Sequence, residues 1–187
     1  DEEVSRGLGD VYKRQAHGST RRQQAVAWPL RLNGLQRVEL IDTPGIDEID
    51  AAGRTRLATR VAMGVDLVLL VIDSDLTRCD RDALETLQAS GKPVRLVLNR
   101  SDRWPEEQLP ELLDSIRSRL PSDLPLTAVA AAPRQPRLDA DGRVRSSAAP
   151  AWVSHLKQQL VDQFQREGEL LLACLLYTSP SPRDTSS

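Results

Sequence analysis

Two short polar segments follow apolar stretches and carry residue types that could bind a nucleotide. The first is Asp42-Thr43-Pro44-Gly45, directly after the predicted strand 37–41. An aspartate at the end of a strand can hold Mg²⁺ through water, because this ion prefers oxygen ligands. A glycine lets the backbone approach a phosphate group closely enough to donate its N–H group. A strand-ending turn uses the same residue types, so this segment alone leaves both interpretations open.

The second segment, Asn99-Arg100-Ser101-Asp102, directly follows the apolar run 94–98. The carboxylate of Asp102 could accept hydrogen bonds from N1–H and the 2-amino group of guanine. Adenine lacks these donors, and polar sites of this kind discriminate by about 10⁴-fold. Asn99 could bridge the base to a phosphate-binding loop, and Arg100 could stack its planar guanidinium on the ring. A polar strand end without a ligand is the alternative.

Alternating strands and helices are expected to position these segments. Strands are predicted at 24–32, 36–41, 67–72, 94–98 and 124–130, and helices at 51–63, 80–89, 105–120 and 150–172. Asn33-Gly34 between the first two strands favours an antiparallel hairpin. Continuous apolar runs such as 67–72 are typical of a parallel sheet covered on both faces. The sequence therefore predicts an α/β domain with a mostly parallel sheet and flanking helices, and a polar loop at 134–149.

The order and spacing of the two polar segments resemble the third and fourth GTPase motifs, Asp-x-x-Gly and Asn-Lys-x-Asp. One strand–helix–strand unit separates them, and the resemblance covers nearly all of residues 16–173. Asp-Thr-Pro-Gly followed by an apolar residue is similar to the Era/TrmE-type bacterial GTPases. The resemblance implies a Ras-like fold, a guanine-nucleotide ligand (GTP or GDP), Mg²⁺ as cofactor and slow GTP hydrolysis as a molecular switch.

The resemblance also implies roles for particular residues. Nucleotide contacts fall on Asp42, Thr43, Pro44, Gly45, Asn99, Arg100, Asp102 and Ala131. The segment 17–24 resembles switch I of this group, in which Thr20 would close on the magnesium ion. Thr20 and Asp42 are thus the implied metal ligands, and Thr20 and Gly45 the implied catalytic positions.

Three departures from the family pattern bear on this interpretation. Arg100 stands where lysine is usual, which keeps the positive charge. Residues 130–132 are alanines where the fifth motif usually has Ser-Ala-Lys, so only the backbone N–H of Ala131 or Ala132 could hold the base. Ile46 stands where Ras-like GTPases carry a water-orienting glutamine, which predicts slow intrinsic hydrolysis.

A phosphate-binding loop of the form Gly-x-x-x-x-Gly-Lys-Ser/Thr does not occur in the 187 residues. Of the three lysines, Lys92 follows a glycine but precedes Pro93, which has neither a hydroxyl nor an N–H group. We therefore expect a GTPase domain that lacks strand 1, this loop and helix 1, and that is inactive as given. In this family the missing strand lies between 37–41 and 67–72, so two unpaired inner edges are expected.

Composition and the chain ends limit the remaining possibilities. We expect residues 1–15 to be non-native or disordered, 16–173 to be the truncated GTPase domain and the Ser/Pro-rich 174–187 to be a non-native or disordered tail. A net charge of −2 with scattered arginines gives no direct nucleic-acid signal. Two cysteines far apart and an acidic, non-apolar N-terminus favour a cytoplasmic protein.

Two hypotheses about partners and two alternative functions stay open. The acidic, apolar end of the last predicted helix is similar to relatives with a membrane-associating C-terminal domain, so peripheral inner-membrane association is one hypothesis. An unknown protein effector is the other. The alternative function is a non-catalytic, GTPase-like interaction module that binds no nucleotide. An unrelated doubly wound enzyme is disfavoured, because neither Gly-x-Ser-x-Gly nor Gly-x-Gly-x-x-Gly occurs.

Overall fold

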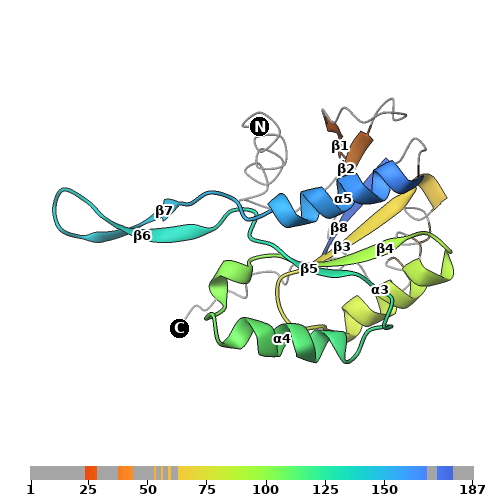
Figure 1. Cartoon of the computed structure of the whole chain (residues 1–187), viewed down its shortest axis with the longest axis horizontal. Coiled ribbons are helices and arrows are strands. Elements are labelled where there is room, and N and C mark those ends of the chain that lie inside the picture. The colour runs from red at the N-terminus through yellow and green to blue at the C-terminus, as the bar shows by residue number, and fades with distance from the viewer. Residues whose placement is uncertain are drawn as a thin grey trace.

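The structure is a computed structural model of the chain, and it describes residues 24–28, 38–43, 53, 56, 59, 63–167 and 172–178. Within these residues, helices cover both faces of a six-stranded sheet, and a separate two-stranded hairpin projects from it (Figure 1). The strands are β1 (Gln24–Trp28), β2 (Val38–Asp42), β3 (Leu67–Ile72), β4 (Val94–Leu98), β5 (Leu126–Ala128), β6 (Arg134–Leu138), β7 (Val144–Ala148) and β8 (Leu172–Thr178). The helices are α3 (Arg78–Ala89), α4 (Gln108–Arg117) and α5 (Ser154–Glu167), with a 3₁₀ turn, η2 (Ser101–Arg103).

The strand order is β1-β2-β8-β3-β4-β5, and only the β1–β2 pair is antiparallel. This arrangement confirms the predicted α/β class and the mostly parallel sheet. The antiparallel pairing of the first two strands is also as predicted, although the turn Asn33-Gly34 lies outside the described residues. The predicted helix 51–63 is described only in part, at helical positions 53, 56, 59 and 63.

β8 lies between β2 and β3, at the place where two unpaired edges were expected. Cys174 of this strand is in register with Ile41 on one side and with Val68 on the other. The expectation of two open inner edges is therefore wrong for this chain, because a later segment pairs with both. The predicted boundary between residues 173 and 174 falls inside β8, and the last helix ends at Glu167 rather than at residue 172.

Alternating side chains of the parallel strands form two separate core layers. The layer beneath α3 and α4 contains Val68, Leu70, Ile72, Leu96 and Leu98. The layer beneath α5 contains Leu67, Leu69, Val71 and Val97, with Leu156, Leu160 and Phe164 from the helix. Trp28 at the end of β1 meets Phe164 edge to face, with ring centroids 6.2 Å apart. The sheet is thus buried on both sides, as its apolar strands require.

Local signals in the sequence explain where the helices begin and end. Thr77 and Asp80 form a capping box at the start of α3, and Gly91 follows its end with φ +73°. The last helix was predicted to begin at residue 150, but α5 begins at Ser154, and Trp152, which precedes it, is 61% exposed. Val153 is buried instead.

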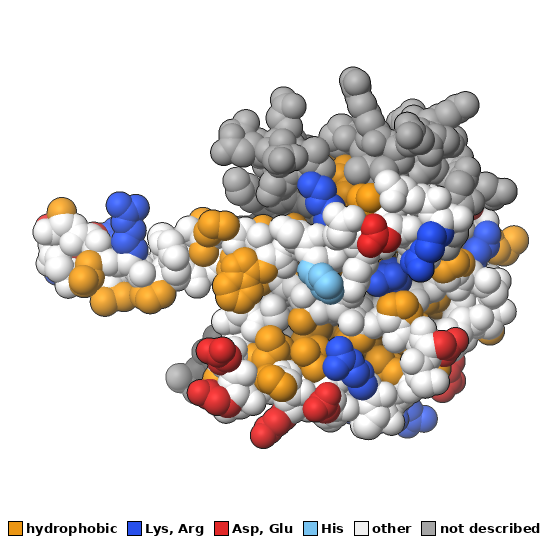
Figure 2. All heavy atoms as spheres, viewed as in Figure 1, with side chains coloured by type: hydrophobic (Ala, Val, Ile, Leu, Met, Phe, Trp, Pro, Cys, Tyr) orange, Lys and Arg blue, Asp and Glu red, His pale blue; other side chains and the backbone are white. Residues whose placement is uncertain are grey.

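Residues 134–148 form the hairpin β6–β7 rather than the predicted polar loop. It projects from the rest of the chain, and Figure 2 shows apolar and basic side chains exposed along it. Leu138 and Val144 pair in register although both are about two-thirds exposed, at 68% and 70%. Gly142 turns the chain with φ +72°, and Arg145 binds Asp139 at 2.7 Å. Local turn chemistry therefore holds this hairpin without a core.

None of the helices in the described part of the chain has the length and apolar character needed to cross a membrane.

Candidate functional site

The carboxyl ends of three parallel strands carry the polar residues of the candidate site. Asp42 ends β2 and is 6% exposed, and Asn99 follows β4 and is 3% exposed. Asp73 follows β3, which is the neighbour of β4 in the sheet. The backbone N–H of Asn99 donates to Ile72 O at 2.7 Å and so joins these two strand ends. Such edges of open α/β sheets are where ligands bind.

The side chain of Asn99 joins this segment to the region after β5. Its Oδ1 atom accepts a hydrogen bond from the backbone N–H of Ala131 at 3.1 Å. The N–H of Ser101 donates to Val129 O at 3.0 Å, which fixes the same two segments at a second point. Two sequence-predicted positions, Asn99 and Ala131, are therefore brought together although 32 positions separate them.

Arg100 adopts a left-handed backbone conformation, with φ 56° and ψ 32°. For a residue with a side chain this conformation costs about 1–2 kcal/mol, and such strain concentrates at functional sites. The guanidinium of Arg100 binds Asp73 Oδ2 at 3.0 Å, where the Arg100 side chain is 43% exposed and that of Asp73 only 6%. Arg100 is thus held by an ion pair in this structure. Stacking of its guanidinium on a guanine ring, which the sequence analysis offered as one role, stays a prediction.

Asp73 is a further candidate residue at this edge, and the sequence analysis did not single it out. The signal was present, since Asp73 directly follows the apolar strand 67–72 in the same way as Asp42 and Asn99 follow theirs.

Asp102 lies in η2, just beyond Arg100, and is half-buried. No residue in the described ranges donates a hydrogen bond to its carboxylate. This carboxylate can therefore accept from a ligand without first breaking a contact.

The residues needed to hold Mg²⁺ are described only in part. Thr20, Pro44 and Gly45 lie outside the described residues, whereas Asp42 and Thr43 are both buried at the end of β2. In the described ranges, no group of three His, Cys, Asp or Glu residues could form a closed metal site. Mg²⁺ does not need one, because it commonly binds one or two carboxylates, phosphate oxygens and water. A single buried aspartate at this sheet edge fits that pattern.

Removing the side-chain acceptor of Asn99 should destabilise the domain. In Asn99→Ala the buried N–H of Ala131 loses its acceptor, and we expect a loss of about 1–3 kcal/mol in the free energy of unfolding. Asn99→Asp keeps an acceptor oxygen and serves as the matched control. Urea unfolding measures the loss, and amide exchange at Ala131 reports whether it is local. Equal stability of Asn99→Ala and the parent chain would contradict the role given to this contact.

The fold defines a class, the α/β domains with a mostly parallel sheet, and in this class ligands commonly bind where these polar residues lie, at the carboxyl ends of the strands. The family follows from a comparison of sequences. The chain belongs to the family described as "50S ribosome-binding GTPase", whose model matches residues 7–100.

Curated relatives agree with this family, and a solved structure agrees with the fold. The chain is 46% identical to GTPase Der of Rhizobium johnstonii over 78 residues, which cover 38% of this chain and 16% of Der. It is 36% identical to GTPase Era of Synechocystis sp. over 92 residues, covering 44% of this chain and 29% of Era. The crystal structure of an Aquifex aeolicus Era variant bound to GDP·AlF4⁻ matches with a TM-score of 0.56 and 20% identity, over 76% of this chain and 44% of Era. The fold is therefore Era-like, and the sequence matches span less than a third of the length of the relatives Der and Era.

Proposed function

We propose that this chain carries the base-recognition and magnesium-binding side of a guanine-nucleotide site. The intact protein would bind GTP with Mg²⁺ and hydrolyse it slowly as a molecular switch. The 187 residues alone would not catalyse the reaction, because they contain no Gly-x-x-x-x-Gly-Lys-Ser/Thr loop to hold the phosphates. The proposal also includes a protein effector, a cytoplasmic location and peripheral membrane association. These three points rest on the sequence alone.

The observation that carries the proposal is the hydrogen bond from Ala131 N to Asn99 Oδ1 at 3.1 Å. It supports a base site built from two segments, in which Asp102 accepts from guanine and the Ala131 region lies beside the ring. Arg100 would contribute its stem and its charge while its guanidinium stays paired with Asp73. Asp42 and Thr20 would hold Mg²⁺, Thr43 and Pro44 would line the phosphates, and Gly45 would donate its backbone N–H to the γ-phosphate.

The test compares two proteins. One is the 187-residue chain. The other, the completed chain, joins a strand, a Gly-x-x-x-x-Gly-Lys-Ser loop and a helix to residues 16–171. It stops before β8, because the space between β2 and β3 takes one strand and the added strand must replace β8. We expect micromolar or tighter, Mg²⁺-dependent binding of a fluorescent GDP analogue by the completed chain and no saturable binding by the 187-residue chain. A folded completed chain that binds no nucleotide would count against the proposal.

The alternative function, a nucleotide-free interaction module, is favoured by the absence of the loop and by the alanines at 130–132. The intact gene distinguishes the two functions. A Gly-x-x-x-x-Gly-Lys-Ser/Thr segment upstream of His17 supports the GTPase. An intact gene without this segment supports the module and removes the ligand roles of Asp42, Asn99 and Asp102.

A further inference from the structure

Arg95 is a charged residue at the edge of a core layer that consists mainly of apolar side chains. It is the second residue of β4, where its neighbours on the α5 side of the sheet include Leu69, in register on β3, and Val97. Arg95 is only 8% exposed. An arginine side chain stays protonated in proteins, so the sheet here encloses a positive charge.

The hydrogen bonds of Arg95 do not neutralise that charge. Nη1 donates to Gln163 Oε1 at 3.2 Å and Nη2 donates to Gln159 Oε1 at 2.7 Å, and both acceptors are uncharged amides. The Nε–H group is buried and has no acceptor among the residues that the structure describes. In the described residues Arg95 forms no ion pair with a carboxylate. A buried charge without a counter-ion is costly, so a bound anion would stabilise this arrangement.

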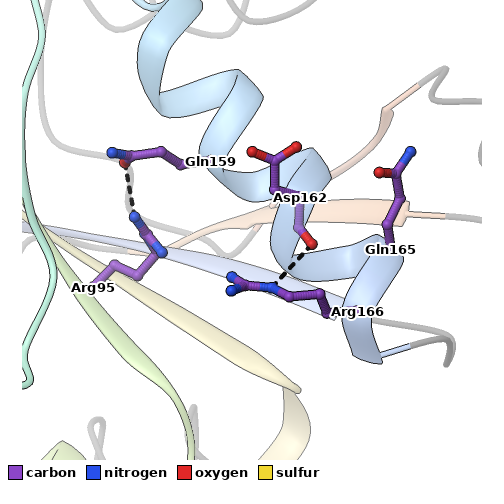
Figure 3. A pocket seen from close by; sticks show the side chains of 5 residues that line it. All are labelled: Arg95, Gln159, Asp162, Gln165 and Arg166. Carbon is purple, nitrogen blue, oxygen red and sulfur yellow. Dashed lines mark hydrogen bonds between the residues drawn. The ribbon is translucent and has the colours of Figure 1, made fainter.

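A second arginine lies at the same place. Arg95 and Arg166 together line a cavity of about 420 Å³ with Gln159, Asp162 and Gln165. In Figure 3 the two guanidinium groups approach the same space from β4 and from α5, while the carboxylate of Asp162 points away from both. Arg166 Nε donates to the backbone carbonyl of Asp162 at 3.3 Å, which holds its guanidinium in that position.

The two arginines also border a neighbouring cavity of about 450 Å³, to whose lining Lys92 adds a third positive charge and Asp123 a negative one. Burial lowers the pKa of the Arg95 guanidinium, and the positive charge of Arg166 lowers it further. Two cations held this close repel one another. An anion bound between the two guanidinium groups would be attracted to both and would offset their repulsion.

We propose that Arg95 and Arg166 form a binding site for a compact oxyanion, of the phosphate type, between β4 and α5. The planar guanidinium groups offer paired N–H donors that match such an anion, and the low exposure of Arg95 strengthens the attraction. The site lies at the amino-terminal end of β4, whereas Asn99 and Asp102 follow its carboxyl end. It is therefore a second site and does not depend on the proposed nucleotide function.

The test titrates the full 187-residue chain with inorganic phosphate at constant ionic strength. Calorimetry gives the dissociation constant, and the Nε–H signal of Arg95 in ¹⁵N-labelled protein reports binding at the residue. We expect saturable binding, a shift of that signal, and at least a fivefold rise in the dissociation constant in Arg166→Gln. Arg95→Met should abolish binding. Arg166 is exposed and its replacement leaves the core intact, so this variant still tests the site if Arg95→Met fails to fold.

Controls separate this site from the nucleotide site and identify the form of the anion. Arg117→Gln on α4 and Asp102→Asn should leave phosphate binding unchanged. Binding of phosphate and of glycerol phosphate would indicate a phosphoryl group on a larger molecule, and binding of phosphate alone a free ion. No saturable phosphate binding, or binding that survives both Arg95→Met and Arg166→Gln, would overturn the proposal.

Discussion

Replacing Leu175 by proline should strongly destabilise the 187-residue chain. Leu175 lies in the middle of β8, in register with Asp42 of β2 and Leu69 of β3. Proline removes the backbone N–H from this ladder and does not fit an inner strand. The lost hydrogen bond and the strain should together lower the free energy of unfolding by about 2–4 kcal/mol, out of a typical 5–15 kcal/mol.

Urea unfolding followed by circular dichroism measures this effect. Ser186→Pro, which lies beyond β8, provides the control and should unfold like the parent chain. The edges of β2 and β3 freed by Leu175→Pro should also promote association, visible by size-exclusion chromatography. Unchanged stability of Leu175→Pro would mean that β8 does not hold the sheet together in solution.

Asp102→Ala should have the largest effect on nucleotide binding. In the completed chain, the carboxylate of Asp102 is expected to accept two hydrogen bonds from guanine. Hydrogen bonds to a charged group contribute about 1.5–3 kcal/mol each, so their loss should weaken GDP binding by roughly 10²–10⁴-fold. Discrimination between GDP and ADP should fall with it, because adenine lacks both donors.

Competition between the fluorescent GDP analogue and unlabelled GDP or ADP gives both quantities. Asp123→Ala removes an exposed carboxylate that precedes β5 and should leave them unchanged. If Asp102→Ala weakens GDP and ADP equally, Asp102 contributes to folding or general affinity and does not recognise the base.

Much of the fold could be predicted from the sequence because its signals are local. The runs 67–72 and 94–98 are rich in valine and leucine, and both became strands with the predicted bounds. The antiparallel pairing of the first two strands followed from a turn signal between them. Polar residues directly after the strands indicated where a ligand could bind, because ligands of open α/β sheets bind at the carboxyl ends of the strands.

The features that the sequence analysis missed depend on residues far apart in the chain or have only a weak sequence pattern. The pairing of β8 with β2 and β3 cannot be read from residues 172–178 alone, since it requires a space left by strands far earlier in the chain. The hairpin β6–β7 lacks a buried face, so apolar alternation gave no indication of it. The Arg100–Asp73 ion pair joins two strand ends whose side-chain geometry the sequence does not specify.

The central position of β8 also sets an order of events during synthesis. Asp42 and Leu175 are neighbours in the sheet although about 130 residues separate them. At a translation rate of about 5–20 residues per second, the first hairpin waits on the order of ten seconds for this partner. During that interval β2 and β3 present open edges to other nascent chains. A chaperone that shields these edges should therefore raise the yield of folded chain more than one that acts after release from the ribosome.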